Sequence, residues 1–268
     1  MKRKALLSVL FLFFLAVAIF SGYKIIGILS EYRAGESTYE ALQQHVELPD
    51  AGKSNGKVGF PWPSIDAPEE TDGEMAEEEC VLFPEVDFES LLEINDDVIG
   101  WIYIEDTNIN YPVVQGENND QYLYTMIDGK YNSAGSIFMD YRNQPDLTDP
   151  HTILYGHHMK NKTMFADITK YRDQAFYDAH PVCLFMTPEE NYQLKIISAY
   201  VAGPDDPAWQ LDFFSEEEVL QWAKDSMMRS GFSSAAEPQL GDRFITLSTC
   251  SYEFNNARFV LIGVLNTI

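Results

Sequence analysis

A cysteine at the end of an apolar, β-branched segment is the residue of this chain best suited to covalent chemistry. The segment Ile245–Thr249 leads into Cys250, and Arg258 follows eight residues later. A free cysteine has a pKa of roughly 8.5, so a nucleophilic thiol needs a neighbouring base or cation. His157, far upstream within Tyr155–His158, can take the proton, and the charged fork of Arg258 can hold a carbonyl oxygen or an oxyanion. Together the three side chains suit acyl transfer through a thioester.

Each of these residues also has an ordinary structural explanation. A cysteine that ends a strand is more often a small buried hydrophobe, and an arginine that opens a strand is usually a surface charge. Paired histidines after Tyr-Gly also fit a solvated turn. The ordered set favours catalysis over three separate structural roles. We expect His158 to have a supporting or structural role, and His45, His151 and His180 to be ordinary surface or core residues.

Three separated motifs resemble those of a known family. They are Thr246–Cys250 followed by Arg258, Tyr155–Met159, and Thr163–Phe165. This set resembles the sortases, and most of all the class B sortases, over roughly Phe83 to Ile268. Sortases are membrane-anchored cysteine transpeptidases of mainly Gram-positive bacteria. They cleave a sorting signal near the C-terminus of a secreted protein and pass the acyl group to an amine of the cell wall, from a peptidoglycan precursor, or of a pilin.

The resemblance implies a role for each matching residue. Cys250 would be the nucleophile, His157 the general acid and base, and Arg258 the stabiliser of the substrate carbonyl and oxyanion. It also implies an eight-stranded barrel with peripheral helices. Class B members are linked to haem-uptake proteins or to pilus anchoring, and both kinds of client remain open, as does the acceptor amine.

The neighbours of Cys250 are candidates for substrate binding. The hydroxyl groups of Ser248 and Thr249 can position a substrate, although a structural role at a strand end is about as well supported. Backbone amides near Ser251 are expected to assist Arg258 in holding the oxyanion. The loop between Cys250 and Arg258 varies among sortases, so the sequence leaves the distance from the guanidinium to the thiol open.

Two other classes of protein fit parts of this pattern. A papain-like hydrolase also uses cysteine and histidine, but there the cysteine opens a helix and precedes the histidine. Here His157 comes first and Cys250 ends a strand, which argues against that class. The alternative that stays open is a catalytically inert, membrane-tethered extracellular β binding module, in which Cys250 would be buried and unreactive.

The N-terminus has the pattern of a membrane anchor. A basic tail, residues 1–4, precedes nineteen uncharged residues, Ala5–Tyr23, and a second apolar stretch follows Lys24 up to Leu29. Nineteen helical residues span roughly 28 Å, the thickness of a bilayer core. We therefore expect residues 5–29 to be an uncleaved, single-pass transmembrane signal anchor. The positive-inside rule places residues 1–4 in the cytoplasm and the catalytic domain outside the cell.

Composition restricts the partners and cofactors. From Ser30 onwards the chain has 14 Lys and Arg against 42 Asp and Glu, a net charge near −28. Such a surface repels nucleic acid, so we expect no nucleic-acid partner. The three cysteines form no metal-binding motif, and a Cys80–Cys183 disulfide has no support from spacing. We predict no required metal and no cofactor.

The rest of the chain divides into a linker and a domain. Residues 30–82 are expected to hold a short helix, Glu36–Val46, and an acidic flexible linker at Pro49–Glu79 that spaces the domain from the bilayer. Residues 83–268 would be the catalytic domain.

Period-two patterns and turn signals predict eight strands, which indicate a β-barrel or sandwich. They are Val98–Ile104, Ile109–Val114, Ser136–Met139, Thr152–Tyr155, Val182–Met186, Tyr192–Val201, Phe244–Thr249 and Arg258–Leu265. Three helices are predicted at Asp87–Leu92, at Asn118–Ile127 and from the capping box at Ser215 through Met227.

Overall fold

The computed structural model describes residues 2–48 and 83–267, and their strands form a closed eight-stranded barrel. The strand order around the barrel is β10-β8-β7-β3-β4-β5-β6-β9, with parallel pairs only at β4–β5 and β6–β9. The strands are β3 (Val98–Tyr103), β4 (Asn110–Val114), β5 (Ile137–Met139), β6 (His151–Tyr155), β7 (Val182–Met186), β8 (Asn191–Ala202), β9 (Arg243–Cys250) and β10 (Arg258–Thr267). The predicted barrel and all eight strands are confirmed, with ends that differ by one or two residues.

Successive side chains of β9 point alternately into two separate apolar cores. Ile245 and Leu247 belong to the main core inside the barrel, whereas Phe244 on the opposite face belongs to a second cluster. That second cluster lies under helix α4 (Glu216–Met228), whose Trp222 is buried against Phe244. Cys250 has the parity of Phe244, because successive side chains of a strand point to opposite faces. The thiol therefore lies on the outer face of the barrel, at the end of β9.

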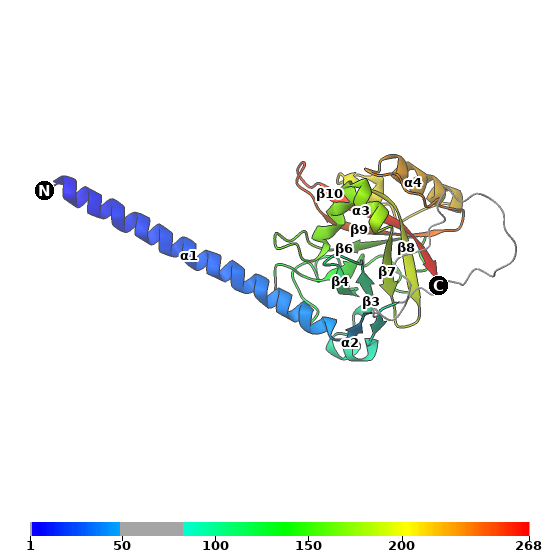
Figure 1. Ribbon diagram of the computed structural model, residues 1–268, viewed down its shortest axis with the longest axis horizontal. Helices are drawn as coiled ribbons and strands as arrows, with labels where there is room; N and C mark the ends of the chain where they lie inside the picture. The colour runs from blue at the N-terminus through cyan, green and yellow to red at the C-terminus, as the bar shows by residue number, and fades with distance from the viewer. Residues whose placement is uncertain (1, 49–82, 268) are drawn as a thin grey trace.

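Helix α1 (Lys2–Gln43) is a single uninterrupted element of 42 residues. The sequence predicted an anchor and a short helix at Glu36–Val46 that continues from it, and the structure has one helix that ends at Gln43. Figure 1 shows its N-terminal part extending far from the barrel, while its last turns lie against the domain. From Leu10 onwards the helix is long and apolar enough to cross a membrane, as judged from length and composition alone.

The end of α1 is packed into the domain. Tyr39 and Leu42 are 5% exposed and join the main core, and the Tyr39 hydroxyl donates a hydrogen bond to the Gly135 carbonyl at 2.5 Å. Beyond the helix, β1 (Val46–Glu47) pairs with β2 (Glu85–Val86), so the described residues on either side of 49–82 are neighbours. The predicted linker at Pro49–Glu79 lies outside the described residues. Its expected spacing role stays a prediction.

Two of the three helices predicted within the domain are confirmed. Helix α2 (Phe88–Ile94) begins after Asp87, which accepts a hydrogen bond from the Ser90 amide, and α4 begins after Ser215, which caps Glu218. The helix predicted at Asn118–Ile127 is wrong, because the segment is a series of turns. Its Asn118 side chain accepts from the Asp120 and Gln121 amides, and the chain then enters a short bridge, Thr125 to Tyr131. Three short helices were not predicted: η1 (Phe165–Arg172), α3 (Gln174–Ala179) and η2 (Pro207–Trp209).

Candidate active site

The pairing of β9 with β10 places Cys250 and Arg258 side by side. The two residues are cross-strand partners at the end of the antiparallel ladder. Side chains of such partners lie on the same face, with Cβ atoms about 5 Å apart. Both residues are partly exposed, and one Arg258 guanidinium nitrogen donates to the Ala257 carbonyl at 3.2 Å. The guanidinium is thus held at the thiol's edge of the sheet with most of its donors available.

The parallel pairing of β6 with β9 brings His157 to the same edge. Tyr155 pairs with Ser248, and the Gly156 amide donates to the Ser248 carbonyl at 3.0 Å. Since parallel strands advance together, His157 emerges level with Cys250, two residues further along each strand. A Cβ atom at Gly156 would lie 2.5 Å from Ile137 and 2.7 Å from Phe165, so only glycine lets the chain pass here.

The imidazole of His157 is oriented by a backbone carbonyl and an aromatic ring. Its Nε2 lies 2.7 Å from the Leu123 carbonyl, and its ring stacks on Tyr124 with centroids 5.5 Å apart. A nitrogen facing a carbonyl oxygen must carry a proton, so Nε2 is a protonated nitrogen and Nδ1 is the ring nitrogen left to exchange a proton with other groups. Gly135, at φ +55°, packs so tightly under Leu123 that a Cβ would lie 2.4 Å from that carbonyl.

His158 has the supporting position expected of it. Its Nδ1 lies 3.1 Å from the Cys250 carbonyl oxygen, and its ring packs at 5.6 Å from that of Tyr252. A protonated Nδ1 therefore ties the histidine segment to the backbone of the cysteine. The bond fixes the two strand ends relative to each other without using the thiol.

The three hydroxyl groups near the thiol have different surroundings. Thr249 Oγ1 donates to the Gly156 carbonyl at 2.8 Å, and Ser251 Oγ contacts both Arg172 and Glu253. Ser248 Oγ is buried and has no hydrogen-bond partner among the described residues. The Ser251 amide donates to the Ala257 carbonyl at 2.9 Å, so this amide closes the loop and does not point to the thiol.

The loop between the cysteine and the arginine is held from outside by Arg172. Arg172, the last residue of η1, donates to Ser251 Oγ at 3.1 Å and pairs with Glu253 at 2.5 Å. Its guanidinium also lies 4.6 Å from the centre of the Phe259 ring. The hydrogen bonds from Ser251 and Arg172 lower the pKa of Glu253, so the carboxylate is charged near neutral pH. Arg172 thereby contacts residues at both ends of the loop, Ser251 and Glu253 after Cys250 and Phe259 after Arg258.

Cys183 and His151 lie apart from this edge. Cys183 is fully buried in β7, where burial raises the pKa of its thiol well above the usual range, and Cys80 lies outside the described residues. His151 is also fully buried, between the Gln210 carbonyl and the Thr246 hydroxyl, each 2.7 Å away. Burial lowers the pKa of His151 to about 4.

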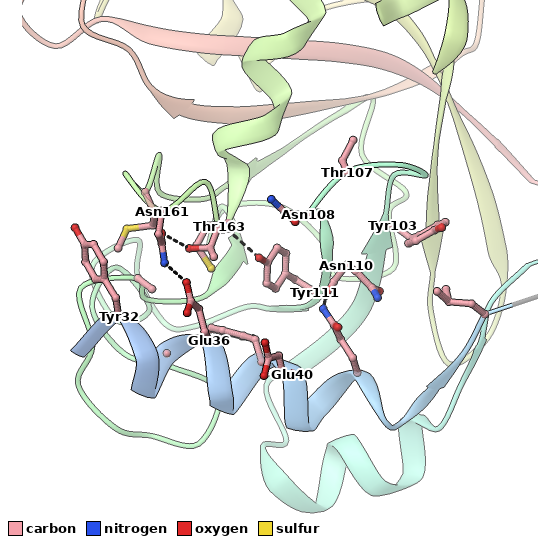
Figure 2. A pocket seen from close by; sticks show the side chains of 17 residues that line it. Tyr32, Glu36, Glu40, Tyr103, Thr107, Asn108, Asn110, Tyr111, Asn161 and Thr163 are labelled. Carbon is pink, nitrogen blue, oxygen red and sulfur yellow. Dashed lines mark hydrogen bonds between the residues drawn. The ribbon is translucent and has the colours of Figure 1, made fainter. Parts of the chain in front are cut away.

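A separate cavity of about 410 Å³ lies between the end of α1 and the barrel (Figure 2). Acidic, amide and tyrosine side chains line it, among them Glu36, Glu40, Asn161 and Tyr111. Its wall includes Met159, Thr163 and Met164, which follow the two histidines in sequence. Within residues 2–48 and 83–267, no group of three or more His, Cys, Asp or Glu side chains is arranged to hold a metal ion.

Comparison with known proteins assigns the chain to a family. The family model described as the sortase domain matches residues 102–266. Sortase B of Staphylococcus aureus is 31% identical over 265 residues, covering 98% of both chains, and sortase B of Listeria monocytogenes is 33% identical over 270 residues, covering 100% of both.

Solved structures agree with the sequence relatives. A sortase B–substrate complex from Staphylococcus aureus has a TM-score of 0.64 and 36% identity, covering 68% of this chain and 85% of that one. A Bacillus anthracis sortase B structure has a TM-score of 0.70 and 30% identity, covering 90% and 100%. The chain belongs to the sortase family. Within that family its relatives over the full length are sortase B proteins, which supports a transpeptidase function in general.

Several residues at this edge had no sequence signal. The Leu123 carbonyl is a backbone group in a segment predicted to be helical, and a helix would have directed that carbonyl along its own axis. Arg172 lies in a 3₁₀ helix, a short element with no clear apolar period. Glu36 and Asn161 are more than a hundred residues apart, and only the packing of α1 brings them together.

Proposed function

We propose that this protein is a sortase B-like cysteine transpeptidase that cleaves a C-terminal sorting signal and joins the acyl fragment to an amine. The observation that supports it best is the convergence of Cys250, Arg258 and His157 at one edge, through two strand pairings that meet at β9. Cys250 is the nucleophile, Arg258 stabilises the carbonyl oxygen and its oxyanion, and His157 transfers protons.

The first half of the reaction forms a thioester. His157 takes the proton of the Cys250 thiol, the thiolate sulfur attacks the carbonyl carbon of the scissile peptide bond, and negative charge develops on the carbonyl oxygen. The Arg258 fork stabilises that charge, a contribution of about 3 kcal/mol for one well-placed donor in other enzymes. As the carbon–nitrogen bond breaks, His157 gives a proton to the leaving amine, and the acyl group remains on sulfur.

The second half reverses these roles. An acceptor amine attacks the thioester carbon, His157 removes a proton from the amine, and the sulfur leaves as thiolate. The result is a new amide bond and a regenerated enzyme. Of the three neighbouring hydroxyls, Ser248 is the one without a hydrogen-bond partner among the described residues, but its oxygen is buried, so a substrate would reach it only after the edge opens. Thr249 and Ser251 make the intramolecular bonds that hold the strand end, so their contribution to substrate binding is indirect.

The proposed setting is the outer surface of a cell membrane. The apolar part of α1 would anchor the chain once, with the acidic domain outside the cell, and residues 83–268 would carry the catalytic activity. The partners would be secreted proteins with a sorting signal and an amine from a peptidoglycan precursor or a pilin. The solved relative bound to a substrate supports a peptide-binding edge in this family.

The test is mass spectrometry of the full chain in detergent, incubated with a pool of sorting-signal peptides with and without amine acceptors. The expected result is a cleaved peptide, an acyl adduct on Cys250 and an amine-linked product. Cys250→Ala is the matched control and should give none of these. A folded protein that forms no adduct with any peptide would contradict the proposal and favour an inert, membrane-tethered binding module.

A further inference from the structure

The loop that carries the two histidines is fastened at its tip to helix α1. Residues 157–164, here called the histidine loop, leave β6 and return to η1, and the His157 carbonyl accepts a hydrogen bond from the Phe165 amide at 3.0 Å. At the tip, Asn161 Nδ2 donates to Glu36 Oε1 of α1 at 2.7 Å. Thr163 Oγ1 donates to Asn161 Oδ1 at 2.9 Å and orients that amide. Figure 2 shows these side chains meeting at the edge of the cavity.

The histidine loop does not adopt a relaxed backbone conformation. Lys162 and Met164 have φ values of 66° and 59°, a region in which residues other than glycine are uncommon. The strained turn is held by bonds from the barrel: the Met164 amide donates to the Tyr111 hydroxyl at 3.1 Å, and Asn108 Nδ2 donates to the Lys162 carbonyl at 3.1 Å. A strained conformation persists only where its surroundings over-determine it.

The contact from α1 differs from the barrel contacts because it involves a charge. Glu36 is partly buried, and a carboxylate that accepts from an amide makes a shorter and stronger bond than two neutral groups do. The same helix is bound to the barrel at further points on this side: Asn132 Nδ2 donates to the Glu31 carbonyl at 2.9 Å, and the Ser133 amide donates to the Glu31 carboxylate at 2.8 Å. The helix is therefore a fixed support for the loop tip.

We propose that Glu36 is a positioning residue, and that its hydrogen bond with Asn161 couples the apolar N-terminal helix to the loop that holds His157 beside Cys250. The inference rests on the proposed function, because it assigns a catalytic consequence to the position of His157. Release of the tip leaves the turn at Lys162 and Met164 with its barrel contacts alone, which lets the loop shift, including the end that carries His157. A displacement of about 1 Å at a catalytic group can reduce the rate by up to a hundredfold.

The contact can be broken and restored by exchanging the partners. Asn161→Asp places two carboxylates against each other, whereas Glu36→Gln leaves a weaker neutral acceptor. In the double variant the new amide at position 36 donates to the new carboxylate at position 161, and Thr163 keeps its acceptor. We expect kcat to fall about tenfold for Asn161→Asp and about threefold for Glu36→Gln. The double variant should return to within about twofold of the wild type.

Two measurements separate positioning from general stability. KM for the sorting peptide should change less than twofold while kcat falls, since the substrate-binding edge is unaltered. Amide hydrogen exchange of residues 157–164 should accelerate about tenfold in Asn161→Asp and return to the wild-type rate in the double variant, with other segments unchanged. Glu40→Gln, one helical turn further along the same cavity wall, is the matched control and should leave kcat and the exchange rates as in the wild type.

Two results would overturn the inference. One is wild-type kcat and wild-type exchange of the histidine loop in Asn161→Asp. The other is a double variant as impaired as the single one, because the effect would then belong to Asn161 alone. If the wild-type chain does not transpeptidate, the proposed function fails, and the exchange rates still decide whether α1 holds the loop. All variants are measured in the full chain, because α1 contributes Tyr39 and Leu42 to the core.

Discussion

Arg258 lies directly opposite Cys250, as its partner in the last rung of the β9–β10 ladder. The seven residues between them form a loop that leaves and re-enters the sheet at one point, so the guanidinium and the thiol share one face of the barrel. Backbone pairing therefore sets the distance between the two groups. What can still vary is the orientation of the Arg258 guanidinium, and we expect the reaction rate to depend on it.

Replacement of Arg258 by lysine tests that orientation. Lysine keeps the positive charge but loses the planar, bidentate fork, so we expect kcat/KM to fall about a hundredfold while the melting temperature changes little. Steady-state transpeptidation with a fluorescent sorting peptide measures the effect. Activity within threefold of the wild type would mean that Arg258 acts only as a general positive charge or points away from the substrate.

Thiol labelling distinguishes a reactive nucleophile from a buried cysteine. In a Cys80→Ser background, iodoacetamide should modify Cys250 in the folded protein and leave Cys183 untouched, because Cys183 is fully buried and its raised thiol pKa leaves almost no thiolate. After unfolding, a second thiol reagent labels the cysteines that iodoacetamide left unmodified. Peptide mapping then shows which reagent each cysteine carries. Equal protection of the two cysteines would support the inert binding module.

The Arg172 contacts predict a kinetic effect without a large loss of stability. Both Arg172 and Glu253 are about two-fifths exposed, so their ion pair contributes at most about 1 kcal/mol to folding. Arg172→Gln should nevertheless lower kcat about fivefold, because it frees the loop that follows Cys250. Lys170→Gln, which removes a neighbouring cation paired with Asp167, is the control and should leave kcat unchanged.

Charge exchange makes that prediction specific. Arg172→Glu alone should be worse than Arg172→Gln, and adding Glu253→Arg should recover most of the lost rate. A double variant no better than Arg172→Glu would show that the guanidinium acts through Phe259 or Ser251 rather than through the ion pair.

His151 predicts how stability depends on pH. Its pKa is lowered by burial to about 4, below the ordinary value near 6.5, so the unfolded chain binds the proton more readily. The contribution of neutral, buried His151 to the free energy of unfolding is fully present above pH 6.5. It is lost as the pH falls towards 4, by about 3 kcal/mol in total. The free energy of unfolding can be measured with urea at several pH values. Between pH 6.5 and pH 4 it should fall less with pH for His151→Gln than for the wild type. Equal slopes would mean that protonated His151 is accommodated in the folded state.

The fold could be predicted because each strand of the barrel has its own residue pattern in the sequence. Alternation from Arg243 to Cys250 and the long apolar run after Arg258 mark their strands without any knowledge of partners. The capping box at Ser215 identified one helix in the same way. The segment from Asn118 to Ile127 misled the prediction because its apolar spacing fits a helix, whereas the Asn118 side chain competes for the backbone amides that a helix needs.

The candidate site was predictable only in its residue types. Cys250, His157 and Arg258 could be named from their motifs, but the contact that orients His157 is a carbonyl at Leu123, which no side-chain pattern reports. The role given to the Ser251 amide also depended on loop closure, and the structure uses that amide to bond Ala257. Long-range pairings such as Glu36 with Asn161 depend on where a helix docks, which is a property of the whole fold.

Because α1 is unbroken, its length determines how far the barrel lies from the apolar segment of the helix. A chain held by a flexible tether would sample many distances from the surface, whereas a barrel bonded to α1 from Glu31 onwards stays at the level where the apolar segment ends. In a membrane-anchored chain, each residue inserted before Glu31 would raise the Cys250 edge by about 1.5 Å. If α1 is the anchor we propose, the helix sets the height of the Cys250 edge above the bilayer, and a substrate peptide bond must be presented at that height to reach its sulfur.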